Sequence, residues 1–275
     1  MFCLLATTGF AVDVYLGRLS QLTWAGSGNN RTALWGGSVS PYWTDYTYVG
    51  RWDFETTNAS GNYLDTSTNG LTGTNSSCVT VITGTNSEGR VEHGIRFNGS
   101  SQVIVNQGNN GVVTNLTNYT TLFWVYFGDS VGLRMVNKNS ASKLQVQSGT
   151  VLGTTLYYQM GNLVDGNQVR SAATLITGQW YHFALTRDST LGTACQIQIY
   201  KDGLFGTAST NVLTGNPQDI YDSGPLLFGY DTFDPAYLSA NSILDEIRIY
   251  DGVMSASQIS NVYTYTHPTN NMVLR

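Results

Sequence analysis

The segment GQWYHFALTRDSTLGTACQIQIYKDG, residues 178–203, decides the fold because it contains two strand patterns in succession. In its second half, Ile197 and Ile199 alternate with glutamines, which predicts a strand with one buried and one solvated face. The closing Lys-Asp-Gly is typical of a tight hairpin turn. This part of the chain is therefore expected to form an antiparallel sheet.

The first half of the segment alternates as well. Trp180 and His182 fall on one face of the expected strand, and Tyr181 and Phe183 fall on the other. A single histidine among aromatic residues is typical of a packed sheet residue, so we assign His182 no catalytic role. Further upstream, LFWVYF at residues 122–127 is apolar on both faces, which predicts a central strand covered on both sides.

Similar runs continue in both directions. Short β-branched and aromatic segments recur at about ten-residue spacing, separated by Gly, Asn, Asp and Ser, as an antiparallel sandwich requires. Strands are expected at residues 50–55, 95–97, 102–105, 120–127, 132–137, 143–147, 154–160, 179–187, 195–201, 226–230 and 242–250. A helix is expected only at residues 255–263, where Ser255 and Gln258 fit a capping box.

Composition excludes several classes of protein. Charged residues make up 11% of the 275 residues, against about 25% in an ordinary domain, so a helical bundle is excluded. The net charge is -5 and the 13 basic residues do not cluster, which argues against nucleic acid as a partner. No apolar run is long enough for a membrane-spanning helix. Cys3, Cys78 and Cys195 share no metal-ligand spacing and are expected to be unpaired thiols, with one disulfide bridge as the alternative.

The first 48 residues differ from the rest of the chain and are named the arm. They combine Gly, Ser and Asn with unpatterned aromatic residues, including Trp24, Trp35, Tyr42 and Trp43. Two interpretations stay open. The arm is either a strap over its own domain or an extension whose aromatic residues anchor it in a neighbouring subunit. The start at Met1 lacks the basic residues of a signal peptide, so no secretion signal is expected.

Four blocks carry a resemblance to a known family. They are VGRWDFETTNASGNYLDTSTNGLTG (49–73), GRVEHGIRFNGSSQVIV (89–105), GQWYHFALTRDS (178–189) with IYKDGLFGTAS (199–209), and ILDEIRIYDGVMSASQISNVY (243–263). In content and order they resemble laminin-G-like jelly-roll domains of the concanavalin-A-like lectin and glucanase superfamily.

The resemblance implies an all-β fold, namely a two-sheet antiparallel jelly-roll sandwich with one short C-terminal helix, and the composition of the first 48 residues adds an N-terminal extended arm. We expect the arm at residues 1–48, the sandwich at 49–264 and a C-terminal tail at 265–275. Arg248 is expected to pair with Asp53 or Glu55 if the first and last strands are neighbours.

The enzymatic relatives of this family place a Glu-x-Asp-x-Glu or Glu-x-Asp-x-x-Glu pattern on one strand. This chain lacks it, since Glu55, Glu88, Glu92 and Glu246 form no such pair on an expected strand. No nucleophile elbow, Walker loop or His-Glu-x-x-His helix is present either. We therefore expect no catalytic residues.

Calcium is the metal that suits the oxygen-rich loops of such a sandwich. The resemblance implies Asp53 and Asp245 as ligands where the first and last strands approach each other. Composition indicates an alternative set in the segment from residue 216 to 241, formed by Asp219, Asp222, Asp231 and Asp234. These acids equally fit turns and loop caps.

Aromatic and amide side chains suit the stacking faces and hydroxyl groups of sugars. The candidates for glycan binding are Tyr157, Tyr158, Tyr221, Tyr230, Phe233 and Tyr237. A sandwich with 17 tyrosines also buries many of them, so core packing is the competing interpretation for each.

We expect a non-enzymatic surface or assembly protein. The setting that fits best is a virus particle, as a phage capsid decoration or fibre-associated protein whose arm contacts other subunits and whose outward sandwich binds surface glycans. The alternative is a secreted carbohydrate-binding module or adhesin, with an extracellular location, and a glycoside hydrolase is less favoured.

Overall fold

A computed structural model of the chain describes residues 22–25, 32–35, 47–82, 93–105, 116–129, 134–138, 144–149, 155–160, 168–171, 175–191, 197–205, 209–212, 224–232 and 235–266. The chain divides into two compact units, Met1–Asp45 and Tyr46–Arg275. Each unit is described by itself.

The first unit contains a β-hairpin. Strand β1 (Leu22–Ala25) pairs antiparallel with β2 (Thr32–Trp35). Sequence patterns predicted no strand in the arm, and the hairpin shows that this prediction was wrong. Each strand has only four residues, too few for alternation to be recognised, whereas the connecting letters GSGNNR are typical of a hairpin loop.

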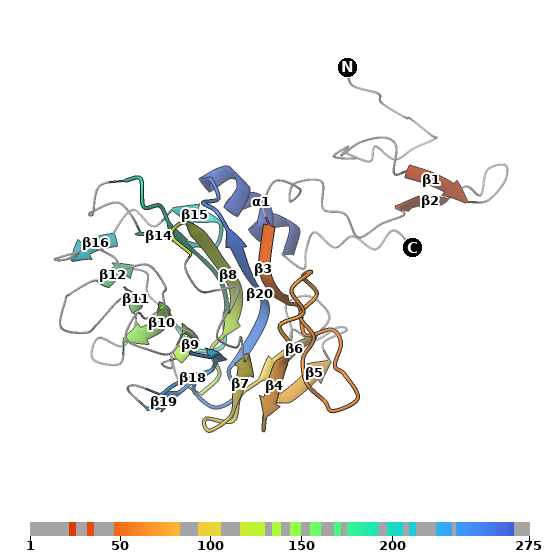
Figure 1. Cartoon of the computed structure of the whole chain (residues 1–275), viewed down its shortest axis with the longest axis horizontal. Helices are drawn as coiled ribbons and strands as arrows, with labels where there is room; N and C mark the ends of the chain where they lie inside the picture. The colour runs from red at the N-terminus through yellow and green to blue at the C-terminus, as the bar shows by residue number, and fades with distance from the viewer. Residues whose placement is uncertain are drawn as a thin grey trace, which may run out of the picture. The chain divides into compact units, whose positions relative to one another are not determined.

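The second unit is built from two antiparallel sheets (Figure 1). Sheet I has the order β15-β14-β13-β8-β20-β6-β5, and β3 also pairs with β20. Its strands are β3 (Thr47–Trp52), β5 (Val79–Ile82), β6 (His93–Arg96), β8 (Tyr119–Tyr126), β13 (Trp180–Arg187), β14 (Ile197–Lys201), β15 (Leu204–Phe205) and β20 (Ile243–Asp251).

Sheet II has the order β16-β12-β11-β10-β9-β17-β7-β4. Its strands are β4 (Gly73–Ser76), β7 (Gln102–Val105), β9 (Arg134–Lys138), β10 (Leu144–Gly149), β11 (Thr155–Met160), β12 (Gln168–Ser171), β16 (Ser209–Val212) and β17 (Leu226–Phe228). Together the sheets confirm the predicted all-β sandwich of the jelly-roll type.

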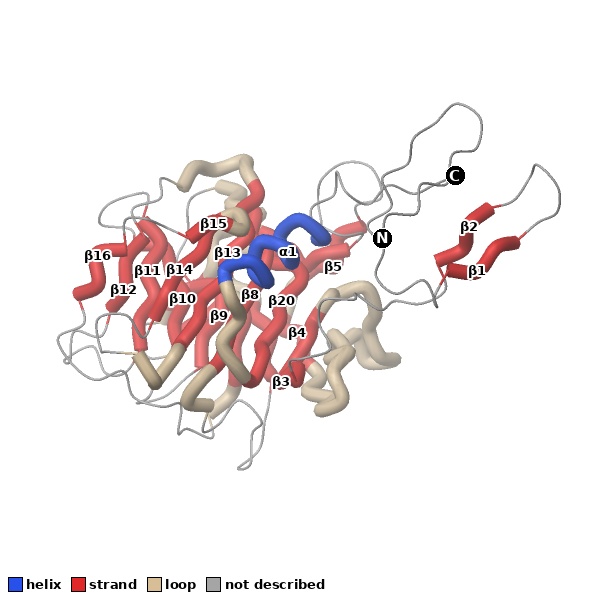
Figure 2. The backbone as a smooth tube through the Cα atoms, turned by 90° about the horizontal axis from the view of Figure 1, so that it is seen from above, coloured by secondary structure: helices blue, strands red, loops and turns tan. Residues whose placement is uncertain are grey.

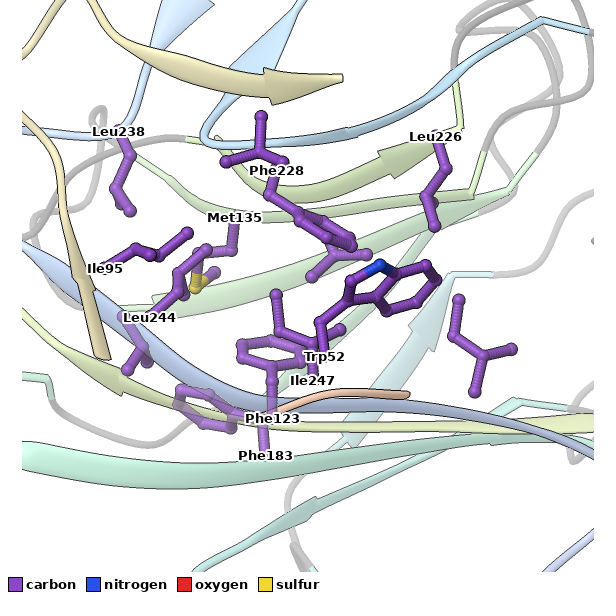
Figure 3. Packing of buried hydrophobic residues seen from close by; sticks show 14 of the residues in the cluster. Trp52, Ile95, Phe123, Met135, Phe183, Leu226, Phe228, Leu238, Leu244 and Ile247 are labelled. Atoms are coloured by element: carbon purple, nitrogen blue, oxygen red, sulfur yellow. The ribbon is translucent and has the colours of Figure 1, made fainter. Parts of the chain in front are cut away.

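The core lies between the two sheets. Phe123 and Phe183, which are opposite each other on β8 and β13, are buried and point toward sheet II (Figure 3). From sheet II, Met135 and Phe228 meet them, and the Trp52 ring packs edge-on against Phe228 at 5.0 Å between centroids. The burial of these large aromatic side chains supplies most of the driving force for joining the sheets.

Helix α1 (Ala256–Thr266) covers part of the outer face of sheet I and lies over the sheet in Figure 2. The Trp124 indole Nε1 donates a hydrogen bond to Thr266 Oγ1 at 2.8 Å, and the Tyr263 ring stacks on Trp124. Strand β8 is thus covered on both sides, as its sequence predicted. The expected capping box forms, because Ser255 N donates to Gln258 Oε1 and Gln258 N donates to Ser255 Oγ.

A short hairpin lies against β9 of sheet II. It consists of β18 (Tyr230–Asp231) and β19 (Ala236–Tyr237), and sequence patterns did not predict it as a separate hairpin. Gly229 connects it to β17 with a φ of 80°, a backbone conformation that glycine adopts without strain.

Strands β4, β5, β12 and β16 were also missed. Each has only four residues, and β4, β12 and β16 are in addition rich in Thr, Ser, Asn and Gln. The expected partner of Arg248 was wrong. The first and last strands are neighbours, but Arg248 bonds to Glu246 on its own strand, because a β-bulge there turns Glu246 to the same buried face. Among the described residues, no helix combines the length and apolarity needed to cross a membrane.

Candidate functional site

The β18–β19 hairpin presents two neighbouring tyrosine rings. Tyr230 and Tyr237 are opposite each other in the ladder, and their ring centroids lie 4.3 Å apart at an interplanar angle of 30°. Both side chains are half-buried, so part of each ring faces solvent. The pair therefore offers a small aromatic surface on the outside of the sandwich.

Buried polar contacts hold this hairpin on β9. Arg134 and Asp231 are almost fully buried, and Arg134 Nε lies 3.6 Å from Asp231 Oδ2. The carboxamide Nδ2 of Asn137 donates a hydrogen bond to the backbone oxygen of Tyr230 at 2.7 Å. Because an unpaired buried charge is costly, the ion pair ties the hairpin to this position on the sheet. Sequence reasoning missed Arg134 and Asn137, since no local pattern shows which strand the hairpin covers.

The backbone register relates Asn137 of β9 to residues on the three strands that follow it in sheet II, β10, β11 and β12. In the register of the sheet, Asn137 is opposite Gln145, Gln145 is opposite Gln159, and Gln159 is opposite Gln168. Directly opposed residues of an antiparallel ladder share a face, and neighbouring strands lie about 4.8 Å apart. The row that starts at Asn137 is therefore composed of carboxamide residues across four strands.

The predicted glycan-binding residues are distributed over several places. Tyr230 and Tyr237 come together as described. Tyr157 and Tyr158 are consecutive in β11, where they are opposite Gln147 and Val146 of β10. Tyr221 and Phe233 lie outside the described residues.

The proposed calcium ligands do not gather into one described site. Asp53 accepts a hydrogen bond from Thr66 and lies 3.6 Å from Arg51, and the buried Asp245 accepts one from the backbone N–H of Glu246. In the alternative set, Asp231 is paired with Arg134, whereas Asp219, Asp222 and Asp234 lie outside the described residues. Within the described ranges no three acidic, His or Cys side chains form a metal-binding group. Calcium binding stays a prediction.

The described glutamates are paired with basic side chains. Glu55 contacts His93, and Glu246 contacts Arg248 in a buried position. Burial lowers the pKa of Arg248, but the charge of Glu246, the neighbouring Tyr250 and Tyr48 and the hydrogen bond to Glu246 together outweigh this effect, and the net pKa is raised. Arg248 therefore remains charged and pairs with Glu246 inside the sheet. Glu88 and Glu92 lie outside the described residues.

The predicted arm residues are only partly described. Trp24 lies in β1 and Trp35 lies in β2, where it is opposite Leu22. Tyr42 and Trp43 lie outside the described residues. Of the three cysteines, Cys78 is a free, buried thiol, and burial raises its pKa to about 12.

A family profile described as the concanavalin A-like lectin/glucanases superfamily, of the laminin-G type, matches residues 97–260. A comparison with curated protein sequences gives no match.

Solved structures share the fold at low sequence identity. Domain 4 of AbnA, a GH43 extracellular arabinanase from Geobacillus stearothermophilus solved in complex with arabinotriose, has a TM-score of 0.56 and 16% identity, and the match covers 79% of this chain and 98% of that one.

The binding domain of Paraclostridial Mosquitocidal Protein 1 has a TM-score of 0.56 at 16% identity, covering 80% of this chain and 52% of that one. The binding domain of botulinum neurotoxin serotype D has a TM-score of 0.57 at 11% identity, with 79% and 50% coverage. This chain thus spans about half the length of the toxin domains. The profile match extends over more than half of the chain, so the chain belongs to the concanavalin A-like lectin/glucanases superfamily.

Proposed function

We propose that this protein is a non-enzymatic glycan-binding protein whose site is centred on the Tyr230–Tyr237 pair. The observation that carries the proposal is this pair of half-buried rings, fixed on the outside of the sandwich by buried polar contacts. Sugar rings stack on aromatic faces, while their hydroxyl groups bond to polar neighbours. In the register of sheet II, the carboxamide residues Asn137, Gln145, Gln159 and Gln168 occupy one row across β9, β10, β11 and β12.

The comparisons support binding over catalysis. The arabinanase domain that this chain matches over almost its full length was solved with an oligosaccharide, arabinotriose. The two toxin matches described above are binding domains. A further match is to botulinum neurotoxin type C, whose cell entry is described as dependent on interaction with two ganglioside molecules. Since the identities are at most 16% among these structures, they favour a class of ligand and not a particular sugar.

An array of immobilised oligosaccharides tests the proposal. It should include arabinan, β-glucan and chitin fragments and sialylated lactose. We expect the full chain to bind at least one glycan and Tyr237→Ala to bind it about tenfold more weakly, because half of the stacking surface is lost.

Phe205→Ala is the matched control. Phe205 is 45% exposed and contacts Tyr200 on sheet I, whereas β18 belongs to a separate hairpin that lies against β9 of sheet II. This variant should bind as the unmodified chain does. Equal binding by Tyr237→Ala and the unmodified chain would exclude the tyrosine pair from the site.

We also propose that the arm attaches the protein to other subunits, with the sandwich facing outward on a virus particle. The separation of Met1–Asp45 from Tyr46–Arg275 as two compact units supports an attachment role for the arm. An extracellular location as an adhesin or binding module is the alternative setting. Purified particles distinguish the two, since a virion protein remains with the particle through density-gradient centrifugation.

A further inference from the structure

A second pair of aromatic rings lies on sheet I. The rings of Tyr126, the last residue of β8, and Trp180, the first residue of β13, have centroids 5.7 Å apart at an angle of 52°. The two residues are opposite each other in the ladder. Both are half-buried, so part of each residue faces solvent.

The rings lie on the outer face of the sheet. Along β8, Phe123 and Val125 belong to the core, so Trp124 and Tyr126 point outward, and on β13 Trp180 shares the face of His182. Trp124 and His182 are each only 1% exposed, because the Tyr263 ring of α1 packs against both.

Helix α1 ends at Thr266, which bonds to Trp124. The next outward position along β8 is Tyr126, and it is left half-buried in the described structure. Along the outer face of β8, Trp124 is thus covered by α1, whereas Tyr126, two residues later, is partly exposed.

The row continues with a cation. Tyr126 is opposite Ile243 of β20, and Ile243 is opposite Arg96 of β6. Ile243 is only 2% exposed, whereas Tyr126 and Arg96 on either side of it in the row are half-buried. An arginine presents several N–H donors in a fixed plane, which suits the oxygen atoms of a ligand.

The loops that follow β6 and β8 and those that precede β13 and β20 are polar, and backbone hydrogen bonds connect them. The backbone N–H of Asn241 donates to Phe97 O, that of Asp129 donates to Ala240 O, and that of Gly178 donates to Phe127 O. Exposed residues on these loops include Asn98, Asp129, Thr177, Gln179 and Asn241. Aromatic faces beside polar side chains suit a sugar, which has apolar ring faces and hydroxyl groups.

From this arrangement we infer a second sugar-binding site on the outer face of sheet I, formed by Tyr126 and Trp180 with Arg96 in the same row. A sugar ring stacks on the two aromatic rings, and Arg96 donates to its oxygen substituents. The site is on the opposite sheet from the Tyr230–Tyr237 pair, so one chain binds glycans on two faces. The inference uses the same ligand class as the proposed function but does not need that site.

The oligosaccharide array described above, probed with the full chain and its variants, tests this inference. Trp180→Ala should lose at least one glycan that the unmodified chain binds, by about tenfold or more. Trp180→Phe keeps a ring and should retain most of that binding, and Phe205→Ala should change nothing. Thermal unfolding of each variant establishes that it is folded before it is compared.

The two sites can fail separately. A glycan lost by Trp180→Ala and kept by Tyr237→Ala supports the site on sheet I, even if the tyrosine pair proves inactive. Retention of every glycan by a folded Trp180→Ala overturns the inference and leaves the proposed function standing. A chain that binds none of the array glycans overturns both.

Self-association is the remaining outcome. If Trp180→Ala changes the mass of the chain in light scattering and leaves glycan binding intact, the rings anchor a protein contact. That result also overturns the inference.

Discussion

At the scale of single residues, Gly229 has the least freedom to change. Its φ is 80°, and a Cβ at this position would lie 2.1 Å from Cε1 of Phe97. Gly229→Ala should therefore lower the free energy of unfolding by about 2–4 kcal/mol through strain and overpacking. Urea unfolding at neutral pH measures this change.

Gly70→Ala is the control for the backbone effect. Gly70 also has a positive φ, 63°, but a Cβ there would meet nothing within 4 Å. Its loss should be about 1 kcal/mol. Equal losses in the two variants would mean that contact with Phe97 is unimportant.

Tyr63 makes stability depend on pH in the alkaline range. Its side chain is buried in the core, and burial raises its pKa from 10.0 to about 12. The folded state therefore holds the proton more tightly than the unfolded state. The stabilisation is complete below pH 10 and is lost as the pH rises through 12.

Tyr63→Phe removes this one phenol and isolates its effect. Relative to its value at pH 8, the stability difference between the variant and the unmodified chain should move in favour of the variant by about 1.4 kcal/mol at pH 11. Urea unfolding at both pH values measures it. A difference that does not change with pH would show that the Tyr63 hydroxyl is not protected.

At the scale of elements, helix α1 depends on its N-terminal cap. Ser255 and Gln258 exchange hydrogen bonds, and the buried Ile259 and Val262 depend on the helix starting at this point. Ser255→Ala should cost about 1 kcal/mol in urea unfolding. Ser255→Asp keeps an acceptor and should cost much less, so a similar loss in both variants would argue against a capping role.

Sequence patterns predicted the strands that have clear alternation and missed those that lack it. Strand β14 was expected from Ile197 and Ile199, and both are buried in the core. Strand β4 was missed because its letters GTNS are turn formers, and only pairing with β7 makes it a strand. Local residue preference is a weak guide where a neighbouring strand supplies the hydrogen bonds.

The candidate sites were predictable only in part for a related reason. Alternation assigned Trp180 to the face of His182, which is correct, but the sequence does not show where α1 stops covering that face. Tyr230 and Tyr237 were expected as ligand residues, whereas their support by Arg134 and Asn137 depends on contacts between segments about ninety residues apart.

At the scale of the whole molecule, the arm and the sandwich should be separable. The second unit starts at Tyr46, and β3 starts at Thr47. A shortened chain that starts at Tyr46 should keep its melting temperature within about 2 °C of the full chain. In light scattering, the full chain should assemble and the shortened chain should be a monomer.

Two other results have distinct meanings. Monomers of equal stability would contradict assembly through the arm. A shortened chain that melts far below the full chain would show that residues 1–45 stabilise the sandwich as a strap.

The most direct test of the central claim is an NMR titration of the isotopically labelled chain with the glycan that binds most strongly on the array. The proposed function predicts that the largest shifts of backbone amide signals occur at Tyr230, Asp231, Ala236 and Tyr237 and at Asn137 beneath them. A titration that saturates while these signals stay in place would contradict glycan binding at the tyrosine pair.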